Sequence, residues 1–282
     1  MYKIVKREDL APNVHLFVID APAVAKKAQP GQFLIVRNSE RGERIPLTIA
    51  DFDRAAGTVS FAFMEVGKTT REMGLLKEGD SLATFVGPLG EATHIKKYGT
   101  VVCVGGGFGT ATVSPIARAM KEAGNHVITI MGFRSQSLMF WEDKLRDFSS
   151  ELIVTTDDGS YGRKSVVTEP LKEMLQDPAR TVDLVVAIGP AIMMKFVSKT
   201  TEPFGTPTVV SLNPIMMDGT GMCGACRVSV GGKTKFACVD GPDFDGHQVD
   251  WDLLLARQKI FIEHEKRALE LWQCQACREQ NS

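Results

Sequence analysis

Five of the six cysteines lie in the last third of the chain, at spacings typical of metal ligands. Cys223 and Cys226 form a C-x-x-C pair, and Cys238 follows this pair after eleven intervening residues. Cys274 and Cys277 form a second C-x-x-C pair near the C-terminus. In a reducing compartment, pairs of this kind indicate metal binding rather than disulfide bonds.

The first group of cysteines has the chemistry of an iron–sulfur site. Such clusters generally take four ligands, and this group supplies three thiolates. The nearest upstream candidate for the fourth ligand is Asp218, because a carboxylate can coordinate iron although it is a harder ligand than a thiolate. The glycines between Asp218 and Cys226 would let backbone N–H groups point at the sulfurs, which helps to set a reduction potential.

Two other interpretations of the cysteines stay open. Zinc could be held by the two C-x-x-C pairs together, although 47 residues separate them. The usual spacing in a zinc site of this type is about 15–20 residues. Zinc would also leave Cys238 without a role, and it would make the chain a nucleotide-binding regulatory subunit rather than a redox protein. A redox-active disulfide is the third interpretation.

A glycine-rich loop at 105–111 has the residue types that bind a nucleotide diphosphate. Glycine lets the backbone approach a diphosphate closely, and the first turn of the following helix presents free N–H groups and partial positive charge. The spacing is not G-x-G-x-x-G, and Gly132-Phe133-Arg134-Ser135 stands where an acidic ribose ligand is usual. A tight strand-to-helix turn that needs glycine is the alternative. Two further turns, 157–162 and 189–191, are expected at the same sheet edge.

The elements that must position these residues divide the chain into three parts. Short apolar runs with turn residues between them predict an antiparallel barrel or sandwich in the first part; they are 15–19, 32–36, 45–49 and 59–63. Strands alternating with helices predict a parallel sheet in the second part; its strands are 100–104, 127–131, 152–155 and 184–188. Cys103 lies in the first of these strands and is predicted to be a core residue.

From Asp218 the chain is predicted to form an irregular glycine-rich loop, a short hairpin that carries Cys238, and a helical tail from Trp251. The predicted boundaries are a barrel domain at 1–97, an α/β domain at 98–213, a cluster-binding domain at 214–265 and a tail at 266–282.

The overall composition excludes some classes of function. The chain has 282 residues and a formal net charge of -1, so its overall charge does not suggest a nucleic-acid or anionic-membrane partner. No apolar run reaches the roughly 18–20 residues that span a bilayer. Residues 1–6 lack the apolar segment of a secretory signal, so a cytoplasmic location is expected.

A barrel, then a nucleotide-type sheet, then a cysteine loop resembles the ferredoxin–NADP reductase superfamily. Within it, the chain is similar to a branch of small electron-transfer subunits that occurs in dihydroorotate dehydrogenase and in electron-bifurcating NADH-dependent ferredoxin:NADP⁺ oxidoreductase. The resemblance covers about residues 1–265. It implies an FAD-binding barrel, an NAD(H)-binding sheet and a [2Fe–2S] domain.

In the barrel, the segment 44–51 takes the place of the family's R-x-Y-S flavin motif. Ile45 stands where arginine is usual, with Arg44 one place earlier, and Leu47 stands for the tyrosine. Thr48 stands for the serine, so it would place a hydroxyl near flavin N5, where hydride arrives, and it is the implied catalytic residue. The segment 66–70 resembles the diphosphate loop, and 87–90 resembles the turn at the end of the barrel. The implied FAD ligands are Arg44, Pro46, Leu47, Thr48, Ala50, Met64, Val66, Gly67, Lys68, Thr69, Thr70 and Gly87.

In the α/β domain, the resemblance implies NAD(H) as the nucleotide. NADP(H) is the less favoured alternative, since a guanidinium at Arg134 could hold a 2′-phosphate. The implied nucleotide-binding residues are Gly106, Gly107, Gly109, Thr110, Arg134, Asp157, Asp158, Gly159, Gly189 and Pro190.

The cysteine loop carries the most specific part of the resemblance. The dihydroorotate dehydrogenase subunit typically has C-x4-C-x2-C and a later fourth cysteine, whereas this chain has Asp218 at the first position, as the small subunit of the bifurcating oxidoreductase does. The implied cluster ligands are Asp218, Cys223, Cys226 and Cys238. A larger partner subunit with flavin and iron–sulfur clusters is implied, with ferredoxin reached through it. Subunits of dihydroorotate dehydrogenase and of a sulfide dehydrogenase are the alternatives.

Overall fold

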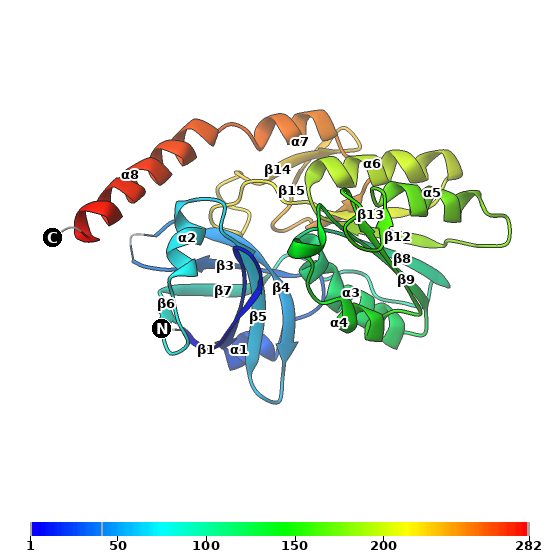
Figure 1. Ribbon diagram of the computed structural model, residues 1–282. Coiled ribbons are helices and arrows are strands. Elements are labelled where there is room, and N and C mark those ends of the chain that lie inside the picture. The colour runs from blue at the N-terminus through cyan, green and yellow to red at the C-terminus, as the bar shows by residue number, and fades with distance from the viewer. Residues whose placement is uncertain (1, 41, 281–282) are drawn as a thin grey trace.

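The structure is a computed structural model that describes residues 2–40 and 42–280, with side chains described as far as Cys274. Figure 1 shows an N-terminal barrel beside a second sheet that is covered by helices, with the C-terminal segment running over the top of both. The division at 97, 213 and 265 stays a prediction. No helix in the described ranges is both long enough and apolar enough to cross a bilayer.

The first sheet is antiparallel throughout and nearly closes into a barrel, which confirms the predicted class. Its order is β6-β1-β2-β5-β4-β3-β7. Four phenylalanines, Phe17, Phe61, Phe63 and Phe85, fill its interior and are almost fully buried. The strands are β1 (Tyr2–Ala11), β2 (Val14–Asp20), β3 (Phe33–Arg37), β4 (Ile45–Asp53), β5 (Thr58–Met64), β6 (Ser81–Leu82) and β7 (Thr84–Leu89), with helices α1 (Pro22–Ala25) and α2 (Lys68–Gly74).

The second sheet has the order β11-β10-β9-β8-β12-β13-β16, and only β16 runs antiparallel. Consequently the ends of β8, β9, β10 and β12 meet at one edge, as predicted. Cys103 is fully buried here, and its burial raises the pKa of its thiol to about 12. The elements are β8 (Thr100–Gly106), α3 (Gly109–Glu122), β9 (His126–Phe133), η1 (Gln136–Leu138), α4 (Glu142–Phe148), β10 (Glu151–Thr156), β11 (Arg163–Lys164), α5 (Thr168–Gln176), β12 (Leu184–Ile188), α6 (Ala191–Thr201), η2 (Glu202–Phe204) and β13 (Thr208–Ser211).

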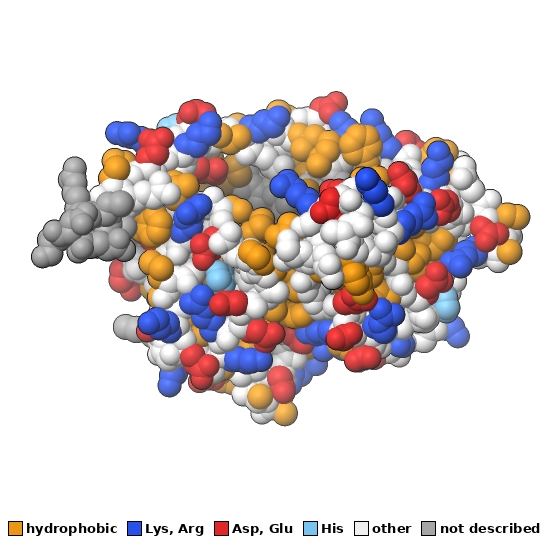
Figure 2. Space-filling view, viewed as in Figure 1, with side chains coloured by type: hydrophobic (Ala, Val, Ile, Leu, Met, Phe, Trp, Pro, Cys, Tyr) orange, Lys and Arg blue, Asp and Glu red, His pale blue; other side chains and the backbone are white. Residues whose placement is uncertain are grey.

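The C-terminal segment contains the hairpin β14 (Arg227–Val230) and β15 (Lys233–Phe236), the strand β16 (Asp243–Asp245), and the helices α7 (Trp251–Arg257) and α8 (Ile262–Gln280). The irregular loop before the hairpin and the helical tail agree with the prediction. The prediction that the hairpin itself carries Cys238 is wrong, because β15 ends at Phe236 and Cys238 lies in the turn beyond it. Acidic and basic side chains are interspersed over the face of the molecule in Figure 2, in keeping with the small net charge.

The predicted turn at 87–90 is also wrong in part, since Gly87, Pro88 and Leu89 belong to β7. A register shift against β3 lies between the pairs Phe33–Leu89 and Ile35–Val86. Such an irregularity admits a proline, which has no N–H to give to a sheet. Six strands were not predicted: β1, β6, β7, β11, β13 and β16.

An ion-pair network joins the barrel to the second sheet. Asp51 near the end of β4 forms an ion pair with Arg118 of α3, whose Nη1 lies 2.9 Å from Asp51 Oδ1, and it accepts a hydrogen bond from Lys144 Nζ of α4 at 2.8 Å. Burial alone would raise the pKa of the Asp51 carboxyl, but the hydrogen bond and charge of Lys144 and the charge of Arg118 hold this pKa below its ordinary value. The network therefore favours the docked arrangement while Asp51 is ionised.

Asp51→Asn is expected to lower the free energy of unfolding at pH 7 by about 1–2 kcal/mol, because two charge-assisted contacts are lost. A carboxyl whose folded-state pKa is lowered stabilises the fold above its unfolded pKa of about 4, and this contribution disappears as the pH falls through the folded-state value. Urea unfolding from pH 7 downward should therefore show the variant and the wild type converging in acid. Asp53→Asn is the matched control, since Asp53 lies on the same strand and only accepts from the backbone N–H groups of Ala55 and Ala56. An equal pH dependence in the two variants would contradict the assignment.

Candidate functional site

A cavity of about 480 Å³ lies between the barrel and the edge of the second sheet where the parallel strands end. The barrel contributes side chains of β3, β4 and β5, and the second sheet contributes the turns after β8, β9 and β12. Nine of the predicted site residues line it together: Pro46, Thr48, Met64, Gly106, Gly107, Gly109, Arg134, Gly189 and Pro190. Residues 46 and 48 point the same way because side chains alternate along a strand.

The walls of this cavity are mainly apolar, with few polar groups. Phe33 and Met64 lie on the barrel side, and the Thr48 hydroxyl and the Arg134 guanidinium are among the polar groups. A largely apolar cleft with a few convergent polar groups is the usual form of a cofactor site. The cavity can hold a planar ring system between the barrel and the glycine turns.

The glycines of the β8–α3 turn are required by close packing. A Cβ on Gly109 would lie 2.1 Å from the Ile188 carbonyl oxygen, and one on Gly106 would lie 2.2 Å from the Met193 sulfur. Gly107 has φ +52, in the left-handed region that favours glycine, and its N–H donates to the Gly132 carbonyl at 2.7 Å. The backbone of this turn thus packs directly on the backbone after β12 and beside β9, and it forms part of the cavity wall.

Several predicted residues do not line this cavity. Ala50 and Thr110 are buried in the core, and the Thr110 hydroxyl has no hydrogen-bond partner among the described residues. Arg44 is exposed, and Leu47 packs on the barrel core. Gly87 packs against Leu34.

The turn that contains Asp157, Asp158 and Gly159 is exposed but adjoins the cavity wall. The backbone N–H of Asp158 donates to the Arg134 carbonyl at 3.2 Å, and that of Asp157 donates to the Phe133 carbonyl at 3.0 Å. Hydrogen bonds from Ser160 lower the pKa of the Asp158 carboxyl. The turn therefore borders the site through its backbone.

The predicted diphosphate loop, Val66 to Thr70, begins at the end of β5 and opens α2. Thr70 Oγ1 accepts from the N–H groups of Val66 and Gly67 at 2.9 and 3.1 Å, which caps the helix. Thr69 donates its hydroxyl proton to Glu43 at 2.5 Å, and Lys68 lies 3.7 Å from Glu72. The side chains of Lys68, Thr69 and Thr70 are thus all engaged by this loop, by α2 or by Glu43, and the first-turn N–H groups of α2 need outside acceptors.

The cavity also includes residues that were not predicted. Phe133 and Phe140 pack edge to face with their ring centres 5.6 Å apart, and Phe108 lies in the glycine turn itself. The end of β13 supplies Ser211, and the segment that follows it supplies Leu212, Asn213, Pro214 and Met216. Because β13 was not recognised as a strand, its C-terminal end was not expected at this edge. The run of β-branched residues Thr208-Val209-Val210 is the signal that could have located it.

Three of the predicted cluster ligands, Asp218, Cys223 and Cys226, lie on the loop before β14, and the fourth, Cys238, lies in the turn after β15. Cys226 and Cys238 are buried with their sulfurs 3.1 Å apart, while Cys223 is exposed. Asp218 accepts from the backbone N–H groups of Thr220 and Cys223, each at 3.0 Å. The N–H of Thr220 is the main cause that lowers the pKa of the Asp218 carboxyl. Burial, followed by the neighbouring Cys226 thiol, raises the pKa of the Cys238 thiol to about 12.

This donor set fits an iron–sulfur cluster in composition, since it offers three soft thiols and one carboxylate from a glycine-rich loop and the turn after the hairpin that follows it. No group of three or more His, Cys, Asp or Glu side chains converges on a metal position within the described residues. Cys223 and Asp218 must therefore turn toward the Cys226–Cys238 pair to complete the site. Gly219, at φ +75, packs this loop on Ile35 and Leu89 of the barrel.

Together, a nearly closed barrel, a parallel sheet with glycine turns at one edge, and a cysteine loop packed against both define a two-domain reductase class with an attached iron–sulfur module. Residues 213–250 match the family described as the iron–sulfur cluster binding domain of dihydroorotate dehydrogenase B. This range holds Cys223, Cys226 and Cys238 but ends before Cys274, which is exposed on α8. The side chain of Cys277 lies outside the described residues. The zinc interpretation, which needs the second pair, gains no support.

Relatives match almost the whole chain. An electron-transfer subunit homologue of dihydroorotate dehydrogenase B from Thermotoga maritima is 50% identical over 268 residues, which is 95% of this chain and 94% of the relative. The electron-transfer subunit of that enzyme from Desulforamulus reducens is 32% identical over 251 residues, or 86% of this chain and 95% of the relative. A chain in the solved structure of NADH-dependent reduced ferredoxin–NADP oxidoreductase, studied for flavin-based electron bifurcation, has a TM-score of 0.91 and 49% identity, covering 96% of this chain and 98% of that one.

The chain belongs to the family of electron-transfer subunits of dihydroorotate dehydrogenase B and their homologues. It is an oxidoreductase-family electron-transfer subunit with an iron–sulfur binding domain. The predicted family, fold class and enzyme class are thereby confirmed.

Proposed function

We propose that this chain passes electrons between NAD(H) and a [2Fe–2S] cluster through FAD, as a subunit of an electron-bifurcating NADH-dependent reduced ferredoxin:NADP⁺ oxidoreductase. The observation that carries the proposal is Asp218 in place of the first cysteine of the cluster loop, on a chain 49% identical to one in the structure of that enzyme. Asp218 favours this enzyme over the dihydroorotate dehydrogenase subunit, which is the second candidate because relatives of that name are 32% identical. A sulfide dehydrogenase subunit is less favoured.

The residues of the cavity have separate tasks in this proposal. Pro46, Thr48 and Met64 form the barrel wall against which the flavin ring lies, and the glycine turns with Arg134 hold the nicotinamide nucleotide on the opposite wall. Val66 to Thr70 hold the FAD diphosphate. Bound FAD exchanges two electrons with NAD(H) and single electrons with the cluster.

Thr48 orients the reacting rings through its hydroxyl, and the surrounding apolar walls exclude water from them. Asp218, Cys223, Cys226 and Cys238 hold the cluster. Electrons then pass to or from a larger partner subunit with further flavin and clusters, through which ferredoxin is reached. We propose NAD(H) rather than NADP(H) as the nucleotide, although Arg134 has the chemistry to hold a 2′-phosphate.

The anaerobic visible spectrum of the purified protein tests the proposal, with iron, zinc and flavin quantified before NADH or NADPH is added. We expect flavin absorption at roughly 450 nm and about two irons per chain, bleached faster by NADH than by NADPH. A colourless protein that contains zinc and no flavin would overturn the cofactor assignment. Spectra of the complex with its partner subunit, with dihydroorotate as the added reductant, separate the two candidate enzymes.

A further inference from the structure

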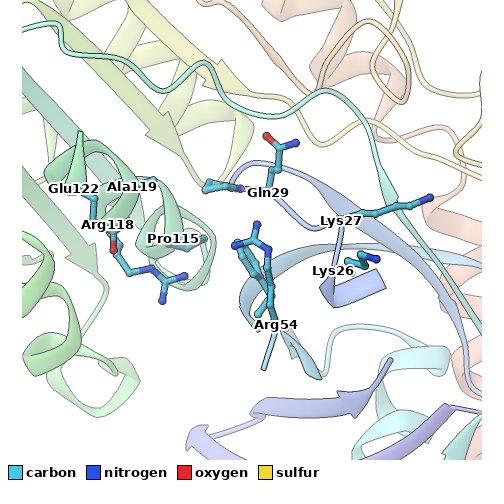
Figure 3. Close-up of a pocket in the computed structure, with 10 residues that line it drawn as sticks. Lys26, Lys27, Gln29, Arg54, Pro115, Arg118, Ala119 and Glu122 are labelled. Carbon is cyan, nitrogen blue, oxygen red and sulfur yellow. The ribbon is translucent and has the colours of Figure 1, made fainter. Parts of the chain in front are cut away.

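A second hollow, of about 700 Å³, lies between the barrel and α3, and we call it the rear groove. Figure 3 shows Lys26, Lys27, Gln29 and Arg54 on its barrel side and Arg118 on its α3 side. It is distinct from the cavity of the proposed redox reaction. Strand β4 lines that cavity with residues 46 and 48, whereas it reaches the rear groove with residue 52 at its other end.

The rear groove concentrates positive charge in a chain whose formal net charge is -1. Lys26, Lys27, Arg54 and Arg118 line it, against one carboxylate, Glu122. Within the described ranges, no carboxylate lies within 4.0 Å of the charged nitrogens of Lys26, Lys27 or Arg54. Cations that lie along one hollow without a carboxylate partner attract an anion.

The two guanidinium groups are held in place rather than free in solvent. Arg54 lies over the Phe52 ring at 4.7 Å from its centre and donates from Nη2 to the Ala28 carbonyl at 2.8 Å. Arg118 lies 5.9 Å from the centre of the same ring, and its Nη1 lies 2.9 Å from Asp51 Oδ1. Each arginine therefore keeps further N–H donors in a fixed fork, the geometry that suits phosphate oxygens.

We propose that the rear groove binds a small phosphorylated anion, a diphosphate or a nucleoside diphosphate, bridging the barrel and the second sheet. The groove has the volume of small-molecule sites, which run from about 300 to 1,000 Å³. The guanidinium and ammonium groups take the phosphates, and the Phe52 face is available to a base or sugar. This goes beyond the proposed electron transfer, which uses neither this groove nor its residues. Because both sheets contribute, the bound anion stabilises their docking.

The test is calorimetric titration of the FAD-loaded full chain with inorganic pyrophosphate and, separately, with ADP. Saturating NAD⁺ is present, so that neither ligand reports on the nucleotide cavity. The double variant Lys26→Glu, Lys27→Glu removes two cations for which the structure gives no side-chain hydrogen bond. The double variant Lys172→Glu, Lys233→Glu makes the same change of charge at exposed lysines elsewhere and is the matched control.

We expect saturable binding that weakens by about tenfold or more in the groove variant and not in the control. Arg54→Lys keeps the positive charge but loses the planar set of guanidinium N–H donors, so it should weaken anion binding as well. The thermal midpoint should rise with ligand in the wild type and not in the groove variant. Equal affinities for pyrophosphate and ADP would show that the groove recognises the phosphates alone. Tighter binding of ADP would show that the Phe52 ring also contacts the base or sugar. Absence of binding, or an equal loss in the groove variant and the control, would overturn the proposal.

Discussion

Asp218→Ala is expected to remove most of the iron and the cluster absorption, while Asp218→Cys keeps the cluster and changes its reduction potential. The alanine variant leaves three thiols for a cluster that generally takes four ligands. The cysteine variant restores the fourth ligand with a softer donor, so binding persists while the electronic environment of the iron changes. Iron content, visible absorption and redox titration measure both effects.

The structure sharpens this prediction because Asp218 has two roles that the variants separate. Its carboxylate accepts from the backbone N–H groups of Thr220 and Cys223, so it shapes the loop even without iron. Asp218→Asn keeps one acceptor oxygen for those bonds and weakens the fourth ligand. If Asp218 acted only on loop shape, the asparagine variant would retain the cluster and the cysteine variant would lose it.

Cys274→Ala is the matched control, since Cys274 is exposed on α8 beyond the matched range 213–250. Its iron content, absorption and potential should equal those of the wild type. Unchanged spectra and potentials in the Asp218 variants would remove Asp218 from the ligand set. Loss of iron in Cys274→Ala would instead bring back a site that uses the second cysteine pair.

The sequence predicts strands best where burial makes them apolar. All four predicted strands of the second sheet are present, because a parallel strand is covered on both faces and reads as a continuous apolar run. Strand β1 was missed because most of its residues are polar or partly exposed, as on the outside of a barrel. The short β13 and β16 complete the sheet through pairing with distant residues, and the only local signal for β13 is the short run Thr208-Val209-Val210.

The same contrast holds for the site. The glycine turns were placed at the sheet edge because parallel strands end there, whereas Pro46, Leu47 and Thr48 were named from the resemblance to a flavin motif; of these three, side-chain alternation leaves Pro46 and Thr48 at the cavity. Ala50 has the same alternation as these two, yet it is buried beneath α3. A register shift after Ile49 marks where β4 leaves the cavity. Only the tertiary packing of α3 determines that change, so local sequence could not show it.

Gly109→Ala is expected to slow the reduction of bound flavin by NADH by about 100-fold, because a misplacement of about 1 Å in a reacting pair costs that much. A Cβ at this position would lie 2.1 Å from the Ile188 carbonyl oxygen and 2.8 Å from the Gly189 Cα. Both neighbours are backbone and cannot rotate aside, so β8 and β12 must separate. The two turns that line the cavity, after β8 and after β12, then lose their relative positions. Anaerobic stopped-flow absorption of the flavin band measures the rate.

A loss of rate from general destabilisation must be separated from this effect, because overpacking also costs about 1–3 kcal/mol of stability. Gly205→Ala is the comparison: Gly205 has φ +63 and nothing within 4 Å of the added Cβ, and it ends η2 away from the cavity. The Gly205→Ala variant should lose about 1 kcal/mol of its free energy of unfolding through backbone strain, and NADH should reduce its bound flavin at the wild-type rate. Iron content should stay normal in both variants, since none of the four proposed cluster ligands lies on the β8–α3 turn or on η2. A wild-type rate in Gly109→Ala would remove this turn from the nucleotide site, and the Gly189 turn would then have to position the nucleotide alone.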